Sequence, residues 1–197
     1  MPVQKHQYET WLSEHCDAVS TIELLKAHRP YFEAIPSLRR SDESVIALPF
    51  PLVRLRSQIL QRGVSGMEVG TGETLCLPCE LGVMMCDPDW KIKTGIEIFV
   101  FVHRPEEDLS DLVGRWRKTQ VLLSKDYEWV MPHRYRHIIS EGADRLYPMF
   151  VVFEETLDRI QRGLIGMNLP FVVETHPLPV REDPVELASA EIPSTSE

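Results

Sequence analysis

Three cysteines form the group whose residue type and spacing most directly suggest chemistry. Cys76 and Cys79 are separated by two residues, and Cys86 follows seven positions after Cys79. Thiolates at this spacing can chelate zinc or an iron–sulfur centre, although a tetrahedral site requires four ligands. The fourth ligand would have to be Cys16, Asp87 or His103. The spacing does not choose among these three. The first expectation is therefore small buried thiols without a cofactor, and a zinc site is the alternative.

A second group of candidates is basic and lies in two segments of the chain. The first segment surrounds Trp116, and the second contains two histidines at positions i and i+4, which would share one face of a helix. The basic residues are Arg115, Arg117, Lys118, His133, Arg134, Arg136 and His137. The glutamate that a zinc-protease motif requires after its first histidine is missing, so that motif is excluded. The pattern predicts a solvated basic surface or, alternatively, a site for a phosphate- or carboxylate-bearing ligand.

The remaining motifs do not indicate a reaction. Four glycines between residues 63 and 72 suggest a phosphate-binding loop, but Glu73 stands where that loop needs lysine. Glu97 and His103 would share one face of a strand, but six residues of strand place them about 20 Å apart. Neither a nucleophile elbow nor another catalytic signature occurs, so catalysis is not the favoured expectation.

Composition excludes several classes of protein. The chain has 197 residues, of which 43% are hydrophobic and 26% charged, and its formal net charge is −9. These values are typical of globular proteins, and the excess of acids disfavours general binding to nucleic acids. The longest apolar runs are too short to span a membrane, and the first residues lack the apolar core of a signal peptide. We therefore expect a soluble, cytoplasmic protein with reduced cysteines.

The last segment of the chain, residues 177–197, differs from the rest. It contains five acidic residues, one arginine and several prolines, and it accounts for −4 of the net charge. Such a segment buries too little apolar surface to offset the entropy of ordering it. The sequence therefore predicts one domain over residues 1–176, with a charge of −5, followed by an acidic disordered tail. A docking peptide around His176–Arg181 is an alternative for the start of this tail.

The elements that must position these residues follow from periodicity. Helical spacing predicts helices over 6–27, 52–62 and 104–123, and a largely helical segment over 133–162. Alternation predicts strands over residues 67–103 and 169–175, with a hairpin at Gly70-Thr71-Gly72. Residues 90–103 are apolar on both faces, which predicts a central strand covered on both sides. Phe150–Phe153 is compatible with either a helix or a strand. The order predicts an α+β fold, in which N-terminal and C-terminal helices pack on a mainly antiparallel sheet.

Two similar segments raise the possibility of an internal duplication. Residues 61–67 and 161–167 share the pattern Gln-Arg-Gly-x-x-Gly-Met, one hundred positions apart. A duplication would relate two helix-to-strand units by a pseudo-twofold axis. The alternative is that both segments simply end helices, with Gly63 and Gly163 in the left-handed position that favours glycine.

Taken together, these features favour a non-enzymatic protein-interaction or assembly module whose partner is another protein or a second copy of the chain. Four tryptophans offer contact surface for this role, because aromatic residues are enriched in interfaces: Trp11, Trp90, Trp116 and Trp129. The alternatives are an enzyme or binding domain for an anionic ligand at the basic residues, and a metal-binding protein that uses the cysteines.

Overall fold

A mixed five-stranded sheet forms the centre of the computed structural model, which describes residues 5–27, 45–55, 57–58, 69–70, 72–86, 93–135, 137–138 and 145–174. The strands lie in the order β1-β6-β7-β9-β10. Their bounds are β1 Val45–Pro49, β6 Leu81–Cys86, β7 Lys93–Val102, β9 Arg145–Phe153 and β10 Phe171–Glu174. The pairs β1–β6 and β6–β7 are antiparallel, whereas β7, β9 and β10 run parallel to one another.

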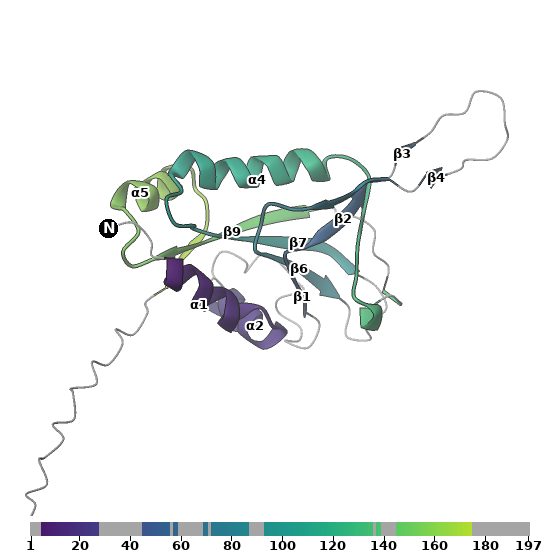
Figure 1. The fold of residues 1–197 in the computed structure, drawn as a ribbon, viewed down its shortest axis with the longest axis horizontal. Coiled ribbons are helices and arrows are strands. Elements are labelled where there is room, and N and C mark those ends of the chain that lie inside the picture. Colours follow the sequence, from purple (N-terminus) through teal and green to yellow (C-terminus); the bar gives the residue numbers. More distant parts are fainter. Residues whose placement is uncertain are drawn as a thin grey trace, which may run out of the picture.

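Four α-helices cover the two faces of this sheet: α1 Lys5–His15, α2 Ala18–Ala27, α4 Leu109–Leu123 and α5 Asp158–Gly166. Figure 1 shows α4 and α5 on one side of the sheet and α1 and α2 on the other. Helix α4 connects β7 to β9, and α5 connects β9 to β10, because parallel neighbours require such crossovers. The predicted α+β class, with helices from both ends of the chain on the sheet, is confirmed, but the central sheet is mixed where a mainly antiparallel one was predicted.

Two smaller sheets extend from the main one. An antiparallel sheet has the order β5-β2-β8, and a two-stranded ladder joins β3 to β4. The bounds are β2 Leu52–Leu55, β3 Ser57–Gln58, β4 Val69–Gly70, β5 Thr74–Cys76 and β8 Tyr127–Trp129. A short 3₁₀ helix, η3 His133–Tyr135, follows β8.

Strand β7 divides the hydrophobic core into two halves. Phe99 and Phe101 pack with α4 and α5, whereas Ile98, Val100 and Val102 pack with α1 and α2. All five side chains are fully buried. The sequence has apolar residues on both faces of this strand, which predicted a central strand covered on both sides, and the structure confirms it.

The helix predicted over residues 6–27 is two helices in the structure. The chain bends at Cys16 and Asp17 and then restarts as α2. The Asp17 carboxylate accepts hydrogen bonds from the backbone N–H groups of Val19 and Ser20, at 2.8 and 3.0 Å. These bonds cap the new helix, and those from Ser20 lower the pKa of Asp17. The side-chain cap at Asp17 therefore divides a segment that the apolar spacing alone predicts as one continuous helix.

The helix predicted over residues 52–62 is wrong across residues 52–55 and 57–58, which form β2 and β3. Val53 is buried between β5 and β8, and Leu52 is 40% exposed, so the segment alternates as a strand does. The hairpin predicted at Gly70-Thr71-Gly72 is also wrong. Strand β4 pairs with β3, and β5 pairs with β2, so both arms find their partners in the preceding segment.

The largely helical interpretation of residues 133–162 is wrong over β9, and Phe150–Phe153 is a strand. Pro148 argued against a central strand, since proline cannot donate to the ladder. The N–H of Phe150 donates to the carbonyl of Pro170, just before β10. Alternate residues of β9, including Pro148, therefore direct their backbone nitrogens towards β10. Pro148 lies two residues earlier, before β10 begins to pair at Phe171. Its missing N–H therefore removes no ladder bond.

The proposed helix stop at Gly163 is likewise corrected, because α5 continues to Gly166. Asn168, with φ of 52°, is the residue in the left-handed region, and its N–H donates to Ile165 at 2.9 Å. Residues 61–67 and 177–197 lie outside the described residues, so the duplication, the disordered tail and the domain limit at 176 stay predictions. Within the described residues, no helix combines the length and apolar character needed to cross a membrane.

Gly82 supplies a test of this packing. A Cβ atom at Gly82 would lie 2.7 Å from Cη2 of Trp129, which is buried and hydrogen-bonded to Glu97. Because the indole is held in place, we expect Gly82→Ala to lower the free energy of unfolding by about 1–3 kcal/mol in urea titrations. The control is Gly114→Ala on α4, where the added Cβ meets nothing within 4 Å and should stabilise the helix by about 0.5–1 kcal/mol. Equal stabilities for the two variants would contradict this packing.

Candidate functional site

The most highly charged part of the interior is a cluster around the buried carboxylate of Glu80, to which several segments of the chain donate hydrogen bonds. The Glu80 side chain is fully buried at the bend before β6. It accepts hydrogen bonds from Nη1 of Arg115 at 2.8 and 2.9 Å and from Nε of Arg104 at 2.8 Å. The hydroxyl of Tyr8 and the backbone N–H of Val102 complete its partners, at 3.0 and 2.9 Å. Helix α1, the end of β7 and helix α4 therefore meet at one carboxylate.

Arg115 extends this cluster to a second buried acid. Its Nε and Nη2 donate to the two carboxylate oxygens of Glu107 at 2.7 and 2.9 Å, and Nη2 also donates to the carbonyl of Val102 at 2.6 Å. The Nε2 atom of His103 hydrogen-bonds the Glu107 carbonyl at 2.9 Å. Two-point pairing of this kind fixes the guanidinium in one orientation. Arg115, one of the predicted anion-binding residues, is thus already occupied by two acids of the same chain.

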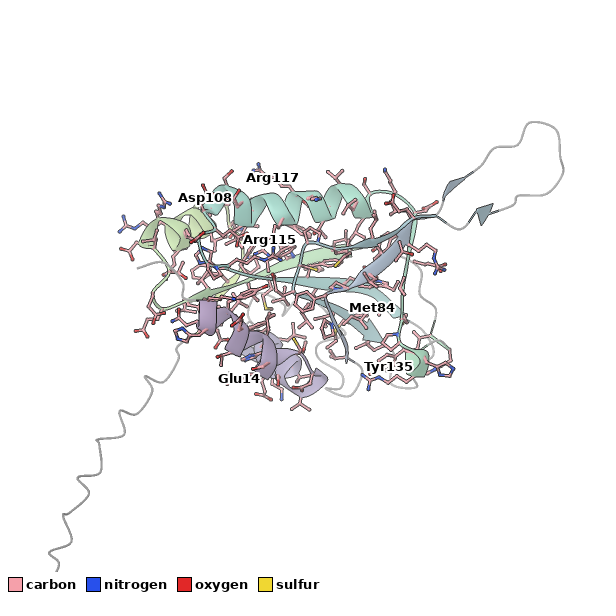
Figure 2. All side chains as sticks on the ribbon, in the orientation of Figure 1. Glu14, Met84, Asp108, Arg115, Arg117 and Tyr135 are labelled. Carbon is pink, nitrogen blue, oxygen red and sulfur yellow. The ribbon has the colours of Figure 1, made fainter. Side chains whose placement is uncertain are left out.

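The orientation of Arg115 also determines what α4 presents to solvent. Residues two positions apart on a helix point to roughly opposite sides. Arg117 is accordingly exposed, and Figure 2 shows it on the outer side of α4 while Arg115 lies between α4 and the sheet.

The outer surface of α4 forms one wall of a groove with α5. The groove has a volume of about 430 Å³, and its lining combines apolar and charged side chains: Asp108, Leu109, Ser110, Val113, Arg117, Arg159 and Met167. It is the strongest candidate for a binding site in the described part of the chain, because a few charged groups stand beside an apolar wall.

The two helices approach closely at one end of this groove. A Cβ atom at Gly163 would lie 2.2 Å from Cδ2 of Leu109, so only glycine allows this contact. Asp108 caps α4 by accepting a hydrogen bond from the Asp111 N–H at 2.9 Å, so the helix begins at Leu109 and not at residue 104 as predicted. The single acid of the groove is therefore already engaged with the backbone.

The two arginines of the groove differ from the other arginine of α5. Neither Arg117 nor Arg159 has an ion-pair or hydrogen-bond partner among the described residues. Arg162, one turn after Arg159, instead pairs with Asp158 at 3.2 Å. In the groove, Met167 remains 39% exposed. The groove thus offers two unpaired positive charges and uncovered apolar surface.

The other predicted anion-binding residues are distributed over separate surfaces. Lys118 is exposed on α4, and His133 and Arg134 are exposed on η3. Arg134 lies over the ring of Tyr135, 4.7 Å from its centroid. Figure 2 shows Tyr135 at the opposite end of the molecule from Arg117. His137 is exposed, and Arg136 lies outside the described residues, so a single site that joins both segments has no support here.

The cysteine cluster is only partly described. Cys76 is exposed, whereas Cys79 is 1% exposed, and burial followed by the nearby Glu80 raises the pKa of the Cys79 thiol well above its usual range. The side chain of Cys86 lies outside the described residues. Among the side chains that are described, no three of the types His, Cys, Asp or Glu could hold a metal ion together. The zinc site stays a prediction that this structure does not test.

Three of the four tryptophans belong to the core and not to a contact surface. Trp11, Trp116 and Trp129 are 1%, 7% and 2% exposed, and Trp90 lies outside the described residues. The Trp129 indole N–H and the Tyr127 hydroxyl both donate to buried Glu97. The prediction that these tryptophans form a contact surface is therefore wrong for the three described residues, because their rings fill the interior.

Of the residues that line the groove, only Arg117 was a predicted site residue, and Arg159 is the most important of those that the sequence did not indicate. In the sequence, Arg159 lies four positions after Glu155, which resembles an ordinary ion pair on a helix. The helix begins only at Asp158, so that spacing does not apply. Arg162 gave the one available signal. It lies four positions after Asp158 and pairs with it, so Arg159 has no carboxylate one helical turn away.

Comparison with known proteins adds no assignment: no family model matches the sequence, and no curated protein and no solved structure is significantly similar to the chain.

The buried cluster gives a prediction with a neighbouring control. We expect Arg115→Met to lower the free energy of unfolding by about 3–5 kcal/mol, because it leaves Glu80 and Glu107 buried without their main counter-charge. Arg117→Met, two residues along the same helix, should change it by no more than about 0.5 kcal/mol. Urea unfolding of both variants measures the difference, and similar losses would show that Arg115 does not hold the cluster together.

Tyr8 gives a second prediction for the same cluster. Burial and the neighbouring Glu80 carboxylate raise the pKa of Tyr8 from 10.0 to about 12. The folded protein therefore favours the neutral phenol, and this contribution to stability is complete below pH 10 and lost as the pH rises through 12. We expect the stability of the wild type relative to Tyr8→Phe to fall between these pH values. Parallel stability curves for the two proteins, measured by chemical unfolding from pH 9 to 12, would rule out the coupling.

Proposed function

We propose that the protein is a non-enzymatic interaction module that binds an acidic and partly apolar segment of a partner protein in the groove between α4 and α5. The observation that carries this proposal is that Arg117 and Arg159, which have no ion-pair or hydrogen-bond partner among the described residues, line the groove beside apolar side chains. A carboxylate of the partner would receive charge-assisted hydrogen bonds from a guanidinium. Apolar side chains of the same segment would cover Leu109, Val113 and Met167.

The residues that line the groove favour a peptide segment over a small inorganic anion. Its two arginines come from different helices and stand beside the exposed apolar side chain of Met167. A small inorganic anion would use the arginines and leave the apolar surface in water. Burial of that surface contributes roughly 25 cal/mol per Å², so an occupant with both kinds of group gains more.

The alternatives from the sequence have less support from the described residues. A site for a small anion at the predicted basic residues lacks Arg115, which is paired with Glu80 and Glu107. His133 and Arg134 lie on η3, away from the groove. A metal-binding function would rest on Cys86, whose side chain is not described. The groove itself contains no group of reactive side chains that would support catalysis.

A selection experiment tests the proposed function. Two displayed peptide libraries are offered to the protein, one with Asp or Glu between Val and Leu residues and one with Lys or Arg in place of the acids. We expect enrichment from the acidic library alone. Fluorescence anisotropy of the tightest peptide should show at least about tenfold weaker binding to the variant R117Q/R159Q, since each lost charge-assisted bond contributes about 1.5–3 kcal/mol.

The matched control is Arg162→Gln, which removes another exposed arginine of α5 that pairs with Asp158 and does not line the groove. Its affinity for the peptide should equal that of the wild type. Enrichment of basic peptides, or equal binding by R117Q/R159Q and R162Q, would overturn the proposed function.

A further inference from the structure

We infer that Glu182–Leu187 of the same chain binds in the α4–α5 groove and competes with partners for it. This inference rests on the proposed function of the groove and adds its regulation. Three observations support it: where the chain leaves the fold, how far the following residues reach, and what chemistry they carry.

The chain leaves the described fold beside the groove. Strand β10 ends at Glu174, whose carbonyl accepts a hydrogen bond from the N–H of Glu154 at 3.1 Å. Glu154 and Arg159 line one pocket that follows the connection from β9 into α5. Arg159 also lines the groove between α4 and α5. Glu174, the last described residue, therefore lies close to the pocket that Arg159 lines.

The following residues are long enough to reach the groove. Glu182 comes eight residues after Glu174. An extended chain covers roughly 3.3 Å per residue, so these residues can span about 26 Å. Helix α5 has nine residues and is therefore only about 13 Å long at 1.5 Å per residue. A short tether of this kind places the segment at an effective concentration of about millimolar.

The segment carries the chemistry that the groove lacks. It reads Glu-Asp-Pro-Val-Glu-Leu, which places three acids beside Val185 and Leu187. The acids complement Arg117 and Arg159, and the apolar side chains complement Leu109, Val113 and Met167. Pro184 reduces the conformational freedom that the segment must give up when it binds. No other stretch after residue 177 combines two adjacent acids with two large apolar residues.

Two matched variants of the full chain test this inference. E182Q/E186Q removes two charges from the segment, and E191Q/E197Q removes two charges from the residues after it. The probe is a fluorescein-labelled synthetic peptide with the sequence of residues 180–189, added to each protein and followed by anisotropy. We expect E182Q/E186Q to bind the probe about tenfold more tightly than the wild type, because its own segment no longer competes. The affinity of E191Q/E197Q should be unchanged.

A second measurement, by NMR, detects binding of the segment at the two arginines of the groove. The Nε–H resonances of Arg117 and Arg159 in ¹⁵N-labelled protein should shift in E182Q/E186Q and stay in place in E191Q/E197Q. The resonance of Arg162, which is paired with Asp158, should not respond in either variant. These shifts should be independent of protein concentration, because the contact is within one chain.

The outcomes separate the inference from the proposed function. Equal probe affinity in all three proteins, with the selected acidic peptide still dependent on Arg117 and Arg159, overturns the inference and leaves the proposed function standing. Failure of the probe to bind any of the proteins also overturns the inference, because the segment then does not fit the groove. Dimers in sedimentation that disappear in E182Q/E186Q would place the segment in a second copy and would equally overturn the intramolecular contact.

Discussion

The arrangement of this protein depends on the buried carboxylate of Glu80. An ionised acid without exposure to water is costly unless several donors surround it, and here donors come from α1, from the end of β7 and from α4. Removing any single donor leaves a charge in the interior, so the three segments are coupled through one atom group. Arg115 carries most of this coupling because it also satisfies Glu107.

The orientation of α4 follows from this cluster. With Arg115 directed at the sheet, the apolar residues Leu112 and Trp116 enter the core, and Arg117 must face outward. Helix α5 then packs against the start of α4, where Gly163 admits the side chain of Leu109. The groove is thus a consequence of core packing, and its two arginines remain exposed because the buried acids are already paired with others.

The candidate site was only partly predictable from the sequence. Arg117 belonged to the predicted basic group, but so did Arg115, and nothing in their spacing revealed that one would be buried against acids and the other free. Arg159 lay in a segment expected to be helical, four residues after Glu155, at the spacing of an ordinary ion pair on a helix. The helix boundary at Asp158 removed that geometry, and such boundaries depend on where the preceding strand ends. The groove itself joins residues more than fifty positions apart.

The sequence by itself determined the features that arise from local chemistry. It predicted the α+β class and the doubly covered strand β7, because alternation is a property of neighbouring residues. Only the tertiary structure decided that β2 and β9 are strands, since their partners are distant and Pro148 argued against one of them. It also decided which charges are neutralised inside the fold and which remain available to bind. That distinction is set by burial and pairing across the chain, which no local pattern records.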